Sequence, residues 1–149
     1  GGTLANRFTT TMSLGVESIE LALSQFETDM FDHRGRPQGV MPKYLVVPPA
    51  QRWIARRLLE TKQRPFTNAN DVNVLTDYDL ELKVLHHLNN NGQWYILGAP
   101  TKTGFRYFDR EKFNTVMDRE PTTQNDLFMA FYRESHGASH PIGAWGNPV

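Results

Sequence analysis

The chain has 149 residues, which is long enough for one domain with a hydrophobic core or for a large part of a bigger protein. Its 16 Lys and Arg residues balance 16 Asp and Glu residues, so strong DNA binding by the isolated chain is not expected, because such binders usually carry a basic excess. The absence of cysteine excludes disulfides, thiol catalysis and cysteine-based zinc sites. No apolar run is long enough for a transmembrane helix, so no membrane partner is expected.

The first predicted element is an amphipathic helix that begins at Ser13, with this serine as its N-cap. Glu17 and Glu20 lie near the positive end of its dipole. Residues 32–37 then read as a turn, in which Gly35 can take a positive φ. One apolar stripe at helical spacing is expected to be buried: Val16, Ile19, Leu23, Phe26 and Met30.

A buried strand is predicted over residues 44–47, where the side chains are apolar and largely β-branched. Pro48 and Pro49 cannot donate to a sheet, so they end the strand, and proline is also suited to the first turn of a helix. A second helix is therefore predicted from Pro49 to about Lys62. Its expected buried face consists of Trp53, Ile54 and Leu58, with Ala50 and Leu59 beside them.

The second helix also carries a basic patch, which consists of Arg52, Arg56 and Arg57 and is extended by Lys62 and Arg64. One interpretation is an ordinary solvated helix surface, because exposed arginine side chains usually extend into water. The other is pairing with acidic groups of a neighbouring copy of the chain. The acidic partners would come from the first helix: Glu17, Glu20, Glu27 and Asp29.

Polar and turn-forming residues precede a predicted β-hairpin in the middle of the chain. The Asn-rich stretch from Pro65 to Asn73 reads as a loop. Residues 80–84 alternate apolar and charged side chains, residues 89–92 favour a turn, and residues 93–97 form the expected return strand.

After a turn at residues 100–104, Asp109 is predicted to cap a short helix that ends at Met117. Residues 127–132 are apolar at every position, which indicates a strand that is buried on both faces or lies at an interface. Residues 136–149, rich in Gly and Pro, are expected to be a flexible tail. The simplest organisation is one α+β domain over residues 1–149, with its core at about 13–135.

No group of residues has the pattern of a catalytic, cofactor or metal site. His136 and His140 lie in a Gly-containing segment and supply too few zinc ligands, even with His86 and His87 considered. Glu134, Ser135 and His136 are adjacent, so their side chains are not expected to face one another, and no nucleophile elbow surrounds the serine. A second group, Asp77, Asp79 and Glu81, lacks the glycine and terminal glutamate of a calcium loop.

The strand, the two prolines and the helix of residues 44–59 resemble the signature of tailed-bacteriophage major capsid proteins, whose shells share the Hong Kong 97-type fold. Residues 32–37 resemble the polar turn that these proteins place ahead of that strand. Residues 82–85 and 94–97 are similar to the pair of β segments that follows it. The end of the chain, from Phe128 to Trp145, is loosely similar to the closing strand of the family and its late Trp-Gly.

The resemblance implies an α+β fold in which a mixed sheet with flanking helices corresponds to the axial domain plus segments of the peripheral domain. It also implies a C-terminal part of the protein, without the family's N-terminal arm, long extended loop and spine helix. No cofactor or metal is implied.

The function implied is that of a structural subunit of a phage or prophage shell, in the virion capsid and in the bacterial cytoplasm during assembly. Its partners would be other copies in hexamers and pentamers, other phage head proteins, and packaged DNA only through the assembled shell. The candidate contact residues Arg52, Arg56, Arg57, Glu17 and Glu20 come from the charge pattern and not from the family. The alternatives are a small metal-assisted hydrolase that uses His136, His140 and a carboxylate, or another phage morphogenesis or adaptor protein.

Overall fold

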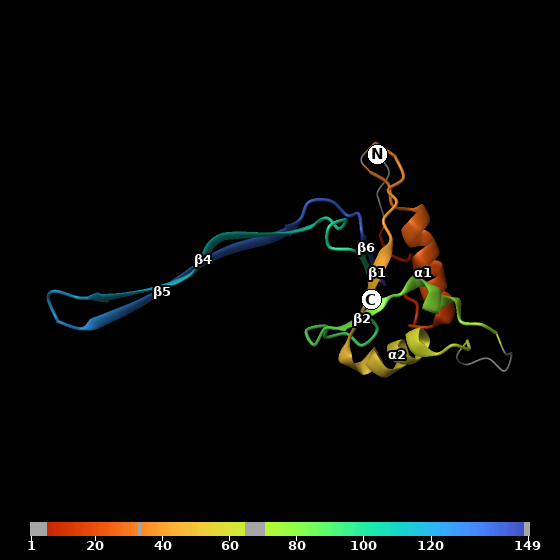
Figure 1. The fold of residues 1–149 in the computed structure, drawn as a ribbon, viewed down its shortest axis with the longest axis horizontal. Helices are drawn as coiled ribbons and strands as arrows, with labels where there is room; N and C mark the ends of the chain where they lie inside the picture. The colour runs from red at the N-terminus through yellow and green to blue at the C-terminus, as the bar shows by residue number, and fades with distance from the viewer. Residues whose placement is uncertain (1–5, 33, 65–70, 148–149) are drawn as a thin grey trace. The chain divides into compact units, whose positions relative to one another are not determined.

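The computed structural model describes residues 6–32, 34–64 and 71–147. The chain divides into two compact units, and Figure 1 shows the secondary structure of both. We call residues 1–104 with 140–149 the core unit and residues 105–139 the hairpin unit. That the whole chain forms a single domain stays a prediction. Among the described residues, no helix is long and apolar enough to cross a membrane.

The core unit contains a four-stranded mixed sheet in the order β2-β1-β3-β6, with two helices, α1 and α2. Strand β1 is parallel to β2 and antiparallel to β3, and β3 is antiparallel to β6. The α+β fold class predicted from the sequence is confirmed. The strands span Pro42–Val47 (β1), Glu81–Val84 (β2), Tyr95–Gly98 (β3) and Ala144–Gly146 (β6), and the helices span Val16–Thr28 (α1) and Arg52–Glu60 (α2).

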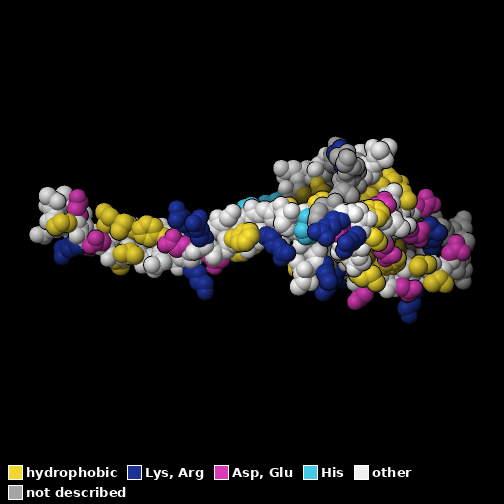
Figure 2. All heavy atoms as spheres, turned by 90° about the horizontal axis from the view of Figure 1, so that it is seen from above, with side chains coloured by type: hydrophobic (Ala, Val, Ile, Leu, Met, Phe, Trp, Pro, Cys, Tyr) yellow, Lys and Arg dark blue, Asp and Glu magenta, His cyan; other side chains and the backbone are white. Residues whose placement is uncertain are grey.

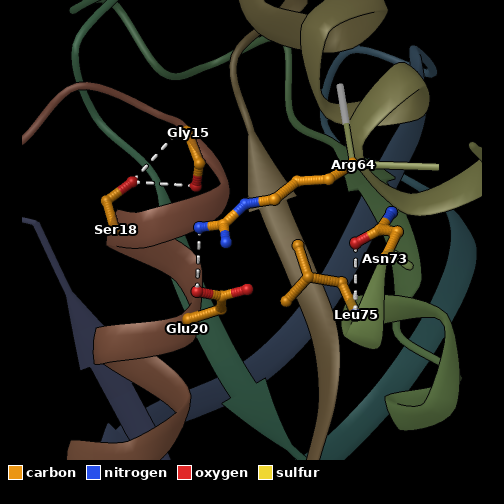
Figure 3. A network of polar contacts seen from close by, with 6 residues as sticks. All are labelled: Gly15, Ser18, Glu20, Arg64, Asn73 and Leu75. Carbon is orange, nitrogen blue, oxygen red and sulfur yellow. Dashed lines mark hydrogen bonds and ion pairs between the residues drawn. The ribbon is translucent and has the colours of Figure 1, made fainter. Parts of the chain in front are cut away.

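The apolar stripe of α1 is buried as predicted, but the N-cap is Gly15 and not Ser13. Glycine has no side chain with which to cap, so the polar contacts come from Ser18 in the first turn. The Ser18 Oγ accepts a hydrogen bond from the Gly15 N–H (2.9 Å) (Figure 3). It also donates to the Ser13 carbonyl (2.8 Å). Ser13 therefore accepts a hydrogen bond through its backbone carbonyl, whereas its side-chain hydroxyl was expected to cap the helix.

The predicted succession of strand, paired prolines and helix is present. Strand β1 ends at Val47, and Pro48 is the N-cap of a 3₁₀ turn, η1 (Pro49–Gln51), that leads into α2. The predicted buried face of α2 is wrong at Trp53 and Ile54, which are 68% and 41% exposed. Because η1 has about three residues per turn and not 3.6, the helical phase counted from Pro49 does not hold in α2. The buried residues of the helix are Ala55 and Leu58.

The predicted hairpin between residues 80–84 and 93–97 is wrong, although both segments are strands. Strands β2 and β3 lie on opposite sides of β1 and do not pair with each other. The connection between them is long enough to cross the end of β1. Residues 89–92 turn as predicted, with the Gly92 N–H donating to the Asn90 Oδ1 (3.0 Å). A second 3₁₀ turn, η2 (Val74–Tyr78), precedes β2.

Residues 144–146 belong to the core unit, in contrast to the flexible tail expected from residue 136. Trp145 of β6 is buried and packs edge-on against Phe8, which also contacts the buried Trp94. Asn147 donates to the Gly92 carbonyl and accepts from the Met12 N–H. These contacts join the end of the chain to residues near its beginning and to the loop before β3.

The hairpin unit consists of two long antiparallel strands, β4 (Phe105–Arg119) and β5 (Asp126–Ala138). The predicted helix at residues 109–117 is therefore wrong, because pairing with β5 overrides the local capping signal. That the chain lacks the long extended loop of the resembled family stays a prediction. Residues 127–132 do form a strand, but burial on both of its faces is wrong within this chain, where these positions are exposed or half-buried.

The predicted turn at residues 32–37 is described except for His33, and Gly35 takes the expected positive φ of 72°. The Asp32 carboxylate accepts from the Arg34 and Arg36 N–H groups. Of the predicted loop at residues 65–73, residues 65–70 lie outside the described part of the chain.

Candidate interaction surfaces

The basic patch on α2 is exposed, and at least part of its charge is already engaged within the chain. The Arg56 Nε lies 2.8 Å from the Glu60 Oε1, one helical turn away, with both side chains more than half exposed. The Arg52 guanidinium lies 5.6 Å from the centre of the exposed Trp53 ring. Arg57 also has an interaction partner. The patch thus combines arginines with an exposed aromatic ring, a composition that is common at protein interfaces.

The acidic side chains of α1 are also partly used within the chain. The Glu20 carboxylate lies 3.3 Å from the Arg64 guanidinium and so joins α1 to the segment after α2 (Figure 3). Burial and the neighbouring Glu27 carboxylate raise the pKa of Tyr78, whose hydroxyl hydrogen-bonds that carboxylate. Glu17 lies exposed in the first turn of α1, where a negative charge is favourable. Glu17 is therefore more available for an external partner than Glu20 or Glu27.

Asn73 fixes the end of α2, although its sequence context predicts only a loop residue. Its buried side-chain amide donates to the carbonyls of Leu58 (2.7 Å) and Thr61 (2.8 Å), at the end of α2 where helical carbonyls lack partners. Its Oδ1 accepts from the Leu75 N–H (3.3 Å) and so caps η2 (Figure 3). The only sequence signal was an asparagine shortly before an apolar segment, which is too common to be specific.

The hairpin unit has two faces, because side chains along a strand alternate and cross-strand partners share a face. We call the face with the even-numbered residues of β5 the tyrosine face and the face with the odd-numbered residues the arginine face. The register places on the tyrosine face Tyr107, Asp109, Met117, Phe128, Tyr132, Glu134 and His136. The register places on the arginine face Arg106, Phe108, Glu111, Val116, Leu127, Phe131 and Arg133.

Both faces expose large apolar side chains. Figure 2 shows apolar side chains along the side of the hairpin that is in view. A two-stranded hairpin has no second layer of its own, so neither face is covered from within the unit. The exposed apolar side chains of the unit are Phe105, Tyr107, Phe108, Phe113, Val116, Met117, Leu127, Phe128, Phe131 and Tyr132.

A hydrogen-bonded cluster on the tyrosine face holds a carboxylate in place. The Tyr107 hydroxyl donates to the Glu134 carboxylate (2.7 Å), the Tyr132 hydroxyl does the same, and the two hydroxyls lie 3.2 Å apart. Donation from Tyr132 and then from Tyr107 lowers the pKa of Glu134, so the group stays ionised. The pKa of Tyr107 is raised, first by its hydrogen bond to Tyr132 and then by that to Glu134.

The residues considered for catalysis or metal binding were Glu134, Ser135, His136, His140 and the acidic group near Glu81. Glu134, Ser135 and His136 follow one another in β5, so Ser135 lies on the face opposite the other two. Glu81 pairs with Lys83. Among the described residues, no three or more His, Asp or Glu side chains are arranged to hold a metal ion.

Comparison with known protein families identifies a match. The sequence matches the protein family described as phage capsid protein over residues 1–143, which is nearly the whole chain. None of the curated proteins matches it.

Proposed function

The chain belongs to the phage capsid protein family, and we propose that it is a self-assembling subunit of the major capsid shell of a bacteriophage or prophage, with the Hong Kong 97-type fold. The role that family membership gives is structural. In the proposal, symmetric contacts between copies build hexamers and pentamers, and the closed shell encloses DNA. Assembly would occur in the bacterial cytoplasm, with other phage head proteins as further partners.

The observation that carries self-assembly is the hairpin unit with its exposed apolar side chains. Isolated two-stranded hairpins are only marginally stable in water, and large exposed apolar patches mark interaction surfaces. A shell subunit has identical neighbours on several sides, so another copy of the chain is the natural cover for these side chains. The near-neutral charge of the chain fits enclosure of DNA by the shell rather than tight binding by each subunit.

We also propose that the α2 patch of Arg52, Arg56 and Arg57 faces α1 of a neighbouring copy, where Glu17 and Glu20 are the candidate partners. Arg56 and Glu60 are both well exposed, and such a helix pair contributes only about 0.3–0.5 kcal/mol. Arg56→Glu should therefore weaken assembly more than it lowers the melting temperature of the monomer. Arg36→Glu, on the exposed turn before β1, is the matched charge reversal. Normal assembly of the Arg56→Glu variant would contradict this contact.

Self-assembly through the hairpin is tested with polar substitutions at exposed positions, which leave the core intact. Met117 is 75% exposed on the hairpin and Met41 is 72% exposed in the core unit, so Met41→Gln is a matched control for Met117→Gln. We expect sedimentation velocity and negative-stain imaging to show oligomers for the wild type and for Met41→Gln. Met117→Gln combined with Phe128→Gln should shift the protein to monomers. A wild-type chain that stays monomeric at high concentration would contradict the proposal.

A further inference from the structure

Resting on the proposed self-assembly, we propose that the two faces of the hairpin bind each other between copies, the tyrosine face of one chain packing on the arginine face of the next. The occupant of each face is thus a second copy of the same hairpin. The contact is heterologous, because two different surfaces meet, and each copy can bind one neighbour on either side.

The first support is the carboxylate on the tyrosine face. Glu134 is held by the hydroxyls of Tyr107 and Tyr132, and Asp109 lies opposite it on β4. The carboxylate lies beside two aromatic side chains, so a guanidinium could bind the acid and stack on a ring at the same time. Because the carboxylate is already oriented, binding would lose little side-chain entropy.

The second support is the pair of available arginines on the other face. Among the residues that the structure describes, neither the Arg106 side chain nor the Arg133 side chain has a hydrogen-bond or ion-pair partner. Phe108 is exposed between them on the same face. This face also carries Glu111, opposite Arg133 in the register, and no ion pair joins the two within the described residues.

The third support is the apolar half of the hairpin nearer its turn, where both faces expose large side chains. Met117 and Phe128 are register partners on the tyrosine face. The corresponding part of the arginine face carries Val116, Leu127 and Phe131. When two hairpins stack in the same direction, the apolar half meets the apolar half and the carboxylates meet the arginines. One arrangement therefore satisfies both parts of the surface.

Stacking like faces is disfavoured by charge. Two tyrosine faces in contact would bring Glu134 and Asp109 of one copy near the same carboxylates of the other, and like charges across an interface repel. Unlike faces avoid this repulsion. Tyrosine and arginine are also the residue types that most often dominate interface energies, so Tyr107, Tyr132 and Arg133 are the expected anchors.

The test is a charge swap on the full chain, measured by sedimentation velocity over a range of protein concentrations. Glu134→Arg and Arg133→Glu should each weaken association at least tenfold, because each places like charges in the contact. The double variant should regain affinity to within about threefold of the wild type, since the pair is restored in reverse. Glu120→Arg, at the exposed turn of the hairpin, is the control for the change in net charge and should have little effect.

A smaller change at Glu134 tests the same contact in case a charge reversal prevents the hairpin from folding. Glu134→Gln keeps a side-chain oxygen for the two tyrosines, and we expect it to weaken association about fivefold and to reduce its salt dependence. Suppose that the wild type associates but neither single reversal weakens its association, or that the double variant loses as much affinity as the two single variants together. Either result would show that the stacking of unlike faces is wrong, while self-assembly would stand. If the wild type does not associate, both proposals fail.

Discussion

Replacing Asn73 by alanine should destabilise the core unit far more than a loop substitution normally does. The substitution removes three hydrogen bonds: those to the Leu58 and Thr61 carbonyls and that from the Leu75 N–H. Each such bond contributes about 1 kcal/mol net, and leaving a buried carbonyl without a partner costs about 1–3 kcal/mol more. Because the Leu58 contact is buried and the Thr61 contact only partly so, we expect a loss of about 3–4 kcal/mol in the free energy of unfolding. That is a large fraction of the stability of a typical domain, about 5–15 kcal/mol.

The loss can be measured by urea unfolding followed by tryptophan fluorescence, because Trp94 and Trp145 are buried and report on the core. The midpoint should fall while the m-value stays unchanged, since the folded surface is the same. Asn90→Ala is the matched control. It removes a single exposed hydrogen bond, to the Gly92 N–H, and should cost less than about 1 kcal/mol.

Asn73→Asp separates the two roles of the amide. The variant keeps an oxygen to accept from Leu75 but loses both donors, and it places a carboxylate against the Leu58 and Thr61 carbonyls. It should therefore be at least as destabilised as Asn73→Ala. A wild-type midpoint for either variant would show that Asn73 does not hold the end of α2.

Three further predictions concern other parts of the chain. A Cβ at Gly104 would overlap the His140 carbonyl, so Gly104→Ala should lower the free energy of unfolding by about 1–3 kcal/mol in the same urea assay. Gly137→Ala is the control, because a Cβ at that position has no atom within contact distance, and it should leave the free energy of unfolding unchanged. Arg64→Met removes the ion pair with Glu20, whose two side chains are 29% (Arg64) and 39% (Glu20) exposed, and should cost less than about 1 kcal/mol. The effect should shrink in 1 M salt, and a loss that salt does not alter would exclude a screened ion pair. The lowered pKa of Glu134 means that its favourable contacts are present above the carboxyl pKa of the unfolded chain and are lost as the pH falls through the folded value. The raised pKa of Tyr107 works in the opposite direction, so that its contacts are present below the unfolded pKa and are lost as the pH rises through the folded one. NMR titration should show both displacements, and Tyr107→Phe should bring the pKa of Glu134 back toward the ordinary carboxyl range.

The elements that the sequence predicts correctly depend on local signals. The stripe of α1 follows the helical period, and the paired prolines after β1 act through their own ring geometry. Both signals are complete within a few residues. The family resemblance was likewise carried by this local block, residues 44–59.

The errors arise where distant segments decide the structure. The turn at residues 89–92 was visible in the sequence, but the pairing of β1 with both β2 and β3 was not. Asp109 looks like a helix cap until β5 supplies pairing partners along most of β4. The role of Asn73 depends on carbonyls 12 and 15 residues earlier, which no local pattern identifies.

The candidate contact residues were only partly predictable. The charge pattern found the α2 arginines and the α1 acids but could not show that Glu20 is paired with Arg64 in the same chain. The tyrosine and arginine faces depend on the register of two strands, one of which was expected to be partly helical. Residues 127–132 were identified as a candidate interface strand, which is the part of this surface that the sequence does contain.

The two strands of the hairpin unit differ in length, 15 residues in β4 against 13 in β5, and the two surplus residues form irregularities at Asp109–Glu111 and Glu111–Asn114. Such bulges coil a ribbon and interrupt the regular row of amide and carbonyl groups along its rim. A ribbon with a broken rim is a poor template for endless lateral growth into fibres. Growth by edge-to-edge pairing of strands is therefore disfavoured at these positions, although large apolar side chains are exposed on both faces.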